Sequence, residues 1–191
     1  VLITIQDDSR YNSTVDPRNL LAHVWDRFEH LKLKIKVAFE LEFYLISRRK
    51  NLSEKPTPAI SKRTGKQSEG TQVYSMGDLD DFYEFLEDVN EYCKVQDIPA
   101  STASSEFAPG QFEINLNYTD NILKAADDAS LLRRVIKETA IKHEYEATFL
   151  SKPFLNEAGS GMHVHISLFN QNNENMFSDK EGNDSKELLY A

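Results

Sequence analysis

The feature that most constrains the fold is the strict alternation of apolar and polar side chains over residues 162–168. A period of two is typical of a β-strand with one buried face. We therefore expect four apolar residues to face a core: Met162, Val164, Ile166 and Leu168. The opposite face then carries His163, His165 and Ser167. This polar row is either a hydrated strand surface or one wall of a site, and the alternation alone leaves both interpretations open.

Two further segments alternate in the same way. They are residues 37–46 and residues 111–118, and the second follows the turn signal Pro109-Gly110. Acidic residues lie on their polar faces or next to the turn: Glu40, Glu42, Glu106 and Glu113. If all three strands are neighbours in one sheet, four carboxylates converge with the imidazole of His163. The alternative for each acidic segment is an ordinary solvated strand face.

Three segments carry apolar residues at intervals of three and four, which predicts amphipathic helices. The first begins at Asp16-Pro17, a favourable N-cap and first helical residue, and has an apolar stripe over residues 20–31. The others run from about residue 78 to 96 and from about 121 to 143. We expect an α+β fold in which a curved antiparallel sheet carries the carboxylates on its concave face, with the three helices packed against its other side.

The remaining segments are short or irregular. Residues 1–5 and 148–150 predict short strands, and residues 186–191 predict the first turn of a helix. Residues 47–73 and 170–184 are polar and predict loops. The basic residues of the first loop either reach toward a phosphate or are simply solvated: Lys50, Lys55, Lys62, Arg63 and Lys66.

The composition disfavours several classes of partner. The chain has 31 acidic and 22 basic residues and a net charge of −9, which argues against nucleic acid and membrane partners and favours cations. We expect no signal peptide and no transmembrane segment, because every apolar run is far shorter than the roughly 20 residues that span a bilayer. The single cysteine, Cys93, predicts a reducing compartment, by default the cytoplasm. Because the chain starts at Val1 rather than Met, we expect it to be part of a longer protein.

Converging carboxylates need either protons or cations. Two carboxylates about 4 Å apart repel by on the order of 4 kcal/mol at an effective dielectric constant near 20. Hard oxygen ligands with one imidazole favour Mg²⁺ or Mn²⁺ over structural zinc. Paired divalent ions near a glycine-containing loop, here residues 158–161, indicate phosphoryl chemistry. The spacing of these residues does not identify a substrate.

Four motifs in the chain resemble those of the glutamine synthetase family, and they occur in the same order. They are Asp16-Pro17-Arg18, Glu40-Leu41-Glu42-Phe43, the segment EFAPGQFE at residues 106–113, and residues 152–167, which look like the family's ATP-region signature. The resemblance implies part of the family's catalytic-domain barrel. It also implies an ATP-dependent ligase that phosphorylates the side-chain carboxylate of glutamate and lets ammonia or a small amine displace the phosphate.

The resemblance also implies a division of roles among the site residues. Glu42, Glu106 and Glu113 would hold the metal ion nearer glutamate, whereas Glu40 and His163 would hold the ion on the ATP phosphates. His165 and Ser167 would contact the nucleotide, and Gly159 would lie against the amino-acid substrate. No catalytic side chain is identified apart from these ligands. Family members form homo-oligomeric rings with active sites between subunits, so we expect an oligomeric full-length protein.

The wording of several segments is closer to one branch of the family. Residues 111–116 (QFEINL) and 147–153 (ATFLSKP) look more like the gamma-glutamylpolyamine branch, such as the gamma-glutamylputrescine synthetases. Ala158 stands where the ammonia-using enzymes usually carry Asn. We expect residues 1–191 to be the N-terminal part of the catalytic domain, without the family's N-terminal domain and the C-terminal part of the catalytic domain, and to be inactive alone.

Two other functions remain open at this level. The chain could be a non-catalytic scaffold or binding protein that keeps the family's fold, although its intact set of metal-ligand residues speaks against this. It could also be a metal-dependent hydrolase that uses the carboxylates to activate water. In that case the nucleotide-site resemblance of residues 152–167 would have no role.

Overall fold

The computed structural model describes residues 2–6, 8, 13, 15–51, 53–70, 72–179 and 181–190. In chain order the elements are α1 (Pro17–His30), β1 (Lys34–Ser47), α2 (Met76–Asp81), α3 (Tyr83–Val95), β2 (Ala100–Ser105), β3 (Gln111–Leu116), α4 (Ile122–Lys142), β4 (Tyr145–Thr148), β5 (Met162–Phe169) and a 3₁₀ turn, η1 (Leu188–Tyr190). The chain divides into two compact units. One comprises residues 1–38, 118–127 and 164–191, and the other comprises residues 39–117 and 128–163.

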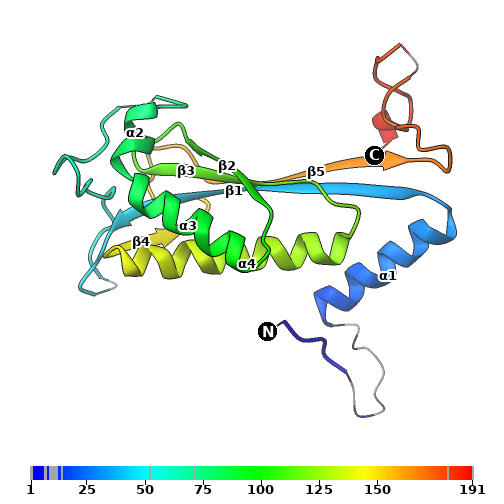
Figure 1. Cartoon of the computed structure of the whole chain (residues 1–191), viewed down its shortest axis with the longest axis horizontal. Coiled ribbons are helices and arrows are strands. Elements are labelled where there is room, and N and C mark those ends of the chain that lie inside the picture. The colour runs from blue at the N-terminus through cyan, green and yellow to red at the C-terminus, as the bar shows by residue number, and fades with distance from the viewer. Residues whose placement is uncertain are drawn as a thin grey trace. The chain divides into compact units, whose positions relative to one another are not determined.

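The strands form a five-stranded antiparallel sheet, which confirms the expected α+β class (Figure 1). Its order is β2-β3-β1-β4, and β5 also pairs with β1. The sheet is open rather than closed over the described part of the chain. In the register between β1 and β3, Glu42 lies opposite Glu113 and Glu40 lies opposite Asn115. Because directly opposed residues share a face, this register alone places the acidic side chains together.

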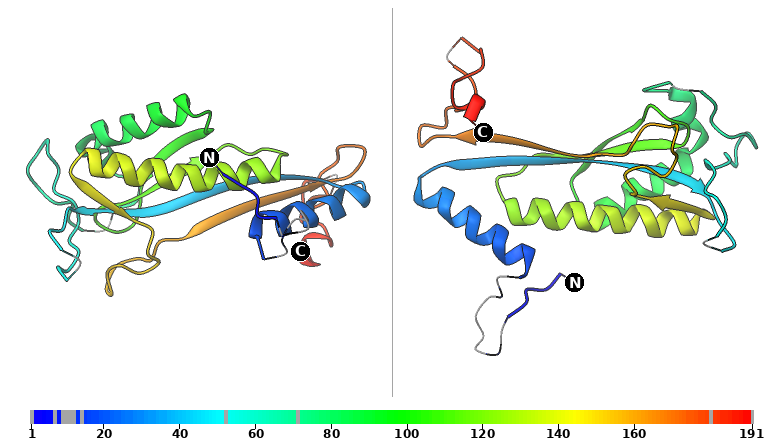
Figure 2. Two further views of the ribbon diagram at one scale, coloured as in Figure 1. Left: turned by 90° about the horizontal axis from the view of Figure 1, so that it is seen from below. Right: turned by 180° about the vertical axis from the view of Figure 1, so that it is seen from behind.

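The main core lies in the unit that contains residues 39–117 and 128–163. Helices α3 and α4 run along one face of the sheet (Figure 2) and pack against the apolar faces of β1 and β3. The ring of Phe43 is fully buried and packs against Phe85, Phe112 and Phe149 at centroid distances of 5.6–6.3 Å. The second and third predicted helices therefore bury the faces that the sequence indicated. The carboxylates of β1 and β3 lie on the opposite face of the sheet, because side chains alternate along a strand.

The end of β1 departs from simple alternation. Tyr44 and Ile46 are as buried as their apolar neighbours, although they belong to the polar face. They form a second small cluster with Ala108, Phe154 and Ala158, contributed by the turn before β3 and the loop before β5. Those two segments therefore cover the second face of the sheet beside the acidic cluster.

The unit with residues 1–38 contains the predicted start of α1. The Asp16 carboxylate caps the helix by accepting from the backbone N–H of Arg18 and also accepts from Ile5. The Arg18 guanidinium makes an ion pair of 3.0 Å with Asp127. The expected buried stripe of α1 is wrong, since none of its residues is buried and Leu20 is 57% exposed. The apolar side chains of α1 are exposed or only partly buried.

The apolar face of β5 is also not buried. Met162, Val164 and Ile166 are 61%, 44% and 55% exposed, which corrects the expectation that they face a core. The strand itself is present as predicted. Period-two alternation reports that one face is apolar, but β5 lies at a sheet edge where no described layer packs on that face.

Smaller corrections concern the limits of elements. The second predicted helix is interrupted at Phe82, whose φ of −115° and ψ of 21° separate α2 from α3. β2 was not predicted, because its sequence ASTASS lacks apolar alternation. Residues 2–5 form no strand, β4 ends at Thr148 rather than beginning there, and the last turn is 3₁₀. Val1 and Ala191 lie outside the described residues. None of the described helices is both long and apolar enough to cross a membrane.

Candidate metal centre

The acidic cluster forms around the imidazole of His163. Its Nδ1 lies 3.0 Å from Oε2 of Glu40 and 3.9 Å from Oε2 of Glu113, and its Nε2 lies 3.7 Å from Oε1 of Glu42. The three carboxylates come from β1 and β3, whereas His163 comes from the start of β5. The structure therefore brings Glu40 and His163 together although they are 123 positions apart in the chain.

A short hydrogen-bonded link fixes β5 against Glu42. The backbone N–H of Glu42 donates to the carbonyl of Gly161 at 3.2 Å, and the N–H of Gly161 donates to Oε2 of Glu42 at 3.1 Å. A Cβ at Gly161 would lie 3.1 Å from Nε2 of His163 and 3.4 Å from Oε1 of Glu42. The glycine therefore leaves the space between the imidazole and the carboxylate open.

Burial and mutual repulsion shift the protonation of this cluster. Burial raises the pKa of Glu106, and the carboxylates of Glu113 and Glu42 raise it further. Burial likewise raises the pKa of Glu113, with added repulsion from Glu40 and Glu42. The hydrogen bond to Glu40 raises the pKa of His163. The charged form of the two carboxyl groups is therefore disfavoured in the free cluster, and a cation placed between the ligands would relieve the same repulsion.

The donor set fits a divalent cation. One ligand atom each from Glu40, Glu113 and His163 lies within 4.8 Å of the other two, and Glu42 adjoins them. Carboxylate oxygens with one imidazole suit Mg²⁺ or Mn²⁺. Glu106 belongs to the same electrostatic group, since Glu113, Glu42 and His163 all act on its pKa. The structure places Glu40, Glu42 and Glu113 around His163, and Glu106 interacts with this group electrostatically. The role of these residues as metal ligands stays a prediction.

Gln111 is a site residue that the sequence reasoning did not single out. Its side chain is buried, and its Nε2 donates to Oε2 of Glu42 and to the carbonyl of Gly159, both at 3.0 Å. Its Oε1 accepts from the N–H of Ala108 at 3.2 Å. Gln111 precedes Glu113 by two residues, so it shares the polar face of β3. Its place on the same strand face as Glu113 was the feature of the sequence that could have identified it.

The loop of small residues before β5 is tightly held. Gly159 has no room for a side chain, because a Cβ there would lie 2.8 Å from the carbonyl oxygen of Ser151. The same carbonyl accepts from the N–H of Ser160 at 2.9 Å, and the Tyr44 hydroxyl donates to the carbonyl of Ala158 at 2.6 Å. These contacts explain the glycine structurally. Its predicted contact with an amino-acid substrate stays a prediction.

The two residues expected to contact nucleotide lie on β5 beyond His163. His165 is exposed and Ser167 is partly exposed, and both belong to the unit with residues 164–191. They follow His163 at intervals of two along the strand. Their predicted contact with ATP is not tested by this arrangement.

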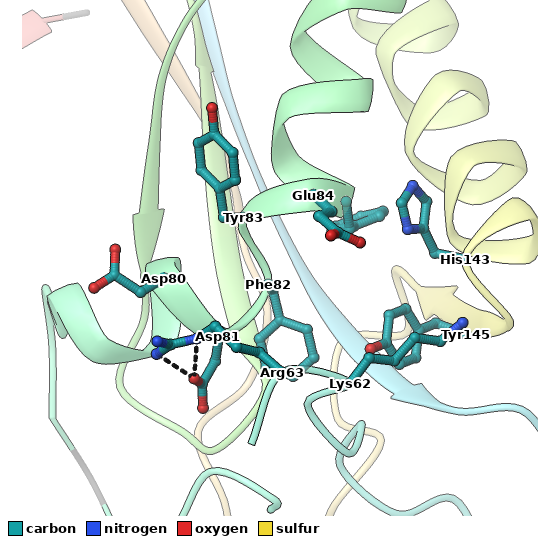
Figure 3. Close-up of a pocket in the computed structure, with 10 residues that line it drawn as sticks. Lys62, Arg63, Asp80, Asp81, Phe82, Tyr83, Glu84, His143 and Tyr145 are labelled. Atoms are coloured by element: carbon teal, nitrogen blue, oxygen red, sulfur yellow. Dashed lines mark hydrogen bonds and ion pairs between the residues drawn. The ribbon is translucent and has the colours of Figure 1, made fainter. Parts of the chain in front are cut away.

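A separate cavity of about 250 Å³ lies beside α2, α3 and β4 (Figure 3). Two basic residues of the long loop reach it, and both are held by carboxylates: Lys62 by Glu144 at 2.6 Å and Arg63 by Asp81 at 2.7 Å. These loop cations are therefore engaged in ion pairs rather than free for a phosphate.

Comparisons with known proteins place the chain in context. A family model described as the glutamine synthetase catalytic domain matches residues 14–191. The chain is 43% identical over 185 residues to gamma-glutamylputrescine synthetase PuuA of Escherichia coli K12, an alignment that covers 97% of this chain and 39% of that protein. It is 38% identical over 169 residues to a glutamate–isopropylamine ligase of a Pseudomonas species, covering 88% of this chain and 36% of that protein.

The fold has a matching solved structure. A glutamine synthetase of Plasmodium falciparum superimposes with a TM-score of 0.81 over 98% of this chain and 41% of that chain. Its 22% sequence identity means that this likeness supports the fold alone. The chain spans between 36% and 41% of the length of each of these proteins.

Proposed function

Since the chain belongs to the glutamine synthetase family, with a catalytic-domain match over residues 14–191, we propose that it supplies the metal-binding wall of an ATP-dependent ligase. The ligase would form an amide at the γ-carboxylate of glutamate. The observation that carries this proposal is the cluster of carboxylates around His163 on the open face of the sheet.

The reaction we propose has two steps. A γ-carboxylate oxygen of glutamate attacks the terminal phosphorus of ATP and ADP leaves, which yields a γ-glutamyl phosphate. The nitrogen of an amine then attacks the acyl carbon, phosphate leaves, and the nitrogen loses a proton. When bound, divalent ions would supply positive charge that neutralises the transferring phosphoryl group and orients the acceptor.

The chain's own residues would position these groups. We assign Glu40 and His163 to the ion on the nucleotide side, and Glu42, Glu106 and Glu113 to the ion on the glutamate side. Gln111 and Gly161 would hold the Glu42 carboxylate, because each donates a hydrogen bond to its Oε2. His165 and Ser167 would contact the nucleotide, and Gly159 would border the glutamate.

For the acceptor we propose a small alkylamine or polyamine rather than ammonia. Support comes from two relatives whose names state an amine substrate, the putrescine enzyme at 43% identity and the isopropylamine enzyme at 38%. The wording of residues 111–116 and 147–153 and the presence of Ala158 point the same way.

We further propose that the chain is the N-terminal part of the catalytic domain of a homo-oligomeric protein and is inactive alone. The relatives named above are more than twice its length. A cytoplasmic location is part of the same proposal, because the sole cysteine is a free, buried thiol.

An acceptor screen with a complete protein that contains this chain tests the reaction. Phosphate release from ATP should require glutamate together with putrescine, ethylamine or isopropylamine. Ammonia as the best acceptor would overturn the amine assignment, and phosphate release without glutamate would overturn the ligase. The 191-residue chain alone should release no phosphate.

A metal titration tests the ligands independently of the acceptor. In the complete protein, Glu106→Ala and His163→Ala should each abolish binding of Mn²⁺ to the cluster, as followed by calorimetry. Glu69→Ala serves as the matched control, because Glu69 is an exposed carboxylate outside the cluster. Unchanged Mn²⁺ affinity in both cluster variants would refute the assignment.

A further inference from the structure

A second cavity, on the helix side of the sheet, carries charge of the opposite sign to the cluster. It lies between α4 and the end of β4 and has a volume of about 410 Å³, a size typical of small-molecule sites. Three basic residues and one acidic residue border it: Arg49, Arg133, Lys137 and Glu146. The cavity is therefore positively charged although the chain as a whole has a net charge of −9.

Two of these basic residues have no ion-pair partner among the residues that the structure describes. Arg49 is paired with Glu146, whose Oε2 lies 2.9 Å from Nη2 of the guanidinium. Arg133 and Lys137 form no ion pair with any residue that the structure describes. They lie one turn apart on α4, and like charges at this spacing destabilise a helix. An anion between them would remove that repulsion.

The guanidinium groups are held in place before any ligand binds. Cζ of Arg133 lies 5.1 Å from the centroid of the Phe149 ring, a cation–π contact that leaves the N–H edge of the guanidinium free. Arg49 donates to Glu146 from Nε, Nη2 and its backbone N–H, so Nη1 remains available. Guanidinium edges of this kind are suited to bind carboxylate and phosphate oxygens.

Apart from Thr148, the rest of the cavity wall is apolar, and it is partly open to water. Ile141 and Leu150 are 51% and 62% exposed, and Phe149, which Arg133 contacts, borders the same cavity. Apolar surface of this kind favours a ligand that has a hydrocarbon part as well as a charge.

We propose that this cavity binds a small organic anion. Its carboxylate or phosphate group would lie between Arg133 and Lys137, and its hydrocarbon part would contact Ile141 and Leu150. The site is independent of the carboxylate cluster, because the cavity shares no residue with it.

Calorimetric titration of the purified chain tests the proposal, with EDTA present so that no divalent ion recruits anions to the cluster. The probes are benzoate, phenyl phosphate and inorganic phosphate. We expect saturable one-site binding of benzoate and of phenyl phosphate. Each should bind at least about fivefold more tightly than inorganic phosphate, because the aromatic ring of the probe would contact the apolar part of the cavity wall. Whichever of the two aromatic probes binds more tightly identifies the anionic group.

Single substitutions locate the binding site. Arg133→Gln and Lys137→Gln should each weaken binding by about tenfold, the loss expected for a hydrogen bond to a charged group. Arg134→Gln is the matched control, since it removes the same charge from the same helix but Arg134 borders a different cavity. Leu150→Ser should weaken the binding of the aromatic probes and leave the binding of inorganic phosphate unchanged.

Several outcomes would overturn the proposal. Absence of saturable binding in the wild-type chain would do so directly. Equal losses in Arg133→Gln, Lys137→Gln and Arg134→Gln would show that only overall charge matters. Circular dichroism of each variant must match the wild type. Lys137→Arg should retain most of the affinity because it keeps the charge, and Arg133→Lys, which keeps the charge but loses the guanidinium edge, should bind more tightly than Arg133→Gln and less tightly than the wild type.

Discussion

Nε2 of Gln111 lies 3.0 Å from Oε2 of Glu42, so a buried neutral amide holds one of the proposed metal ligands. The same Nε2 also donates to the carbonyl of Gly159, and Oε1 accepts from the N–H of Ala108. A single side chain on β3 therefore links a carboxylate of β1, the turn before β3 and the loop before β5. Every polar atom of the Gln111 side chain is used, as burial requires.

Replacing Gln111 by Glu should destabilise the fold. The change turns a donor into an acceptor of the same shape and sets a buried carboxylate against Glu42 and the Gly159 carbonyl. We expect a loss of about 2–4 kcal/mol in the free energy of unfolding at pH 7, measured by urea denaturation. Gln67→Glu is the control, because Gln67 is exposed and its side chain donates a hydrogen bond to the carbonyl of Pro58. Equal losses in the two variants would contradict this view of Gln111.

Replacing Gly161 by Ala should weaken metal binding while leaving the fold intact. The new Cβ would press on Nε2 of His163 at 3.1 Å and on Oε1 of Glu42 at 3.4 Å, both of which are side-chain atoms that can move. We expect the affinity for Mn²⁺ to fall by about tenfold, because ligand positions must be held closely for tight binding. Calorimetry measures this. Gly77→Ala in α2, where the nearest atom is Ser75 Oγ at 3.7 Å, should leave Mn²⁺ binding unchanged.

The alternation of the sequence was sufficient to predict the acidic face. Glu40, Glu42 and Glu113 were placed by strand parity, and the register of β1 with β3 brings them together as expected. Parity could not assign the partner of Gln111, because its hydrogen bonds reach into a turn and a loop whose path is set by tertiary packing. A pattern identifies the face on which a residue lies, and only the fold determines what that residue meets there.

Burial was predicted less well than secondary structure. Phe43 and Phe112 are fully buried as expected, since α3 and α4 cover that face. Leu20 and Ile166 are exposed despite equally regular patterns. Amphipathic periodicity shows which side of an element can be buried, but burial also needs a covering layer. The break between α2 and α3 at Phe82 could not be predicted from the sequence either, because the apolar spacing continues across it.

The buried thiol of Cys93 should make stability fall at high pH. Burial raises its pKa from 9.0 to about 11, so the folded state keeps its proton where the unfolded state has lost it. The contribution of this group is therefore complete below pH 9 and declines as the pH rises toward 11. The total is about 3 kcal/mol for a shift of this size. Urea midpoints between pH 8 and 11 under reducing conditions measure the decline.

Cys93→Ala isolates this contribution from other groups that titrate in the same range. Burial also raises the pKa of Tyr44, to about 12, and that of Tyr145. The alanine variant keeps both tyrosines, so the difference between the two chains reports on the thiol alone. A difference that stays constant from pH 8 to 11 would show that the thiol does not contribute.

Glu113→Gln should separate the stability of the fold from the binding of metal. Because burial and the charges of Glu40 and Glu42 raise the pKa of Glu113, its ionised form is disfavoured in the folded chain. The destabilisation is absent below the unfolded pKa and grows as the pH rises from the unfolded pKa to the raised folded pKa. With EDTA at pH 7, the glutamine variant should therefore be more stable than the wild type by about 1 kcal/mol.

Added Mn²⁺ should reverse that order. Saturation at 100 times the dissociation constant stabilises the wild type by about 2.7 kcal/mol, whereas Glu113→Gln lacks the charge that holds the ion and should gain little. Thermal unfolding of both chains, with EDTA and with Mn²⁺, shows whether the order of their stabilities is reversed. Glu69→Gln, which removes an exposed carboxylate, should follow the wild type in both conditions. If Glu113→Gln gained as much from Mn²⁺ as the wild type, Glu113 would not be a ligand, and the acidic face would be only a strained surface of the sheet.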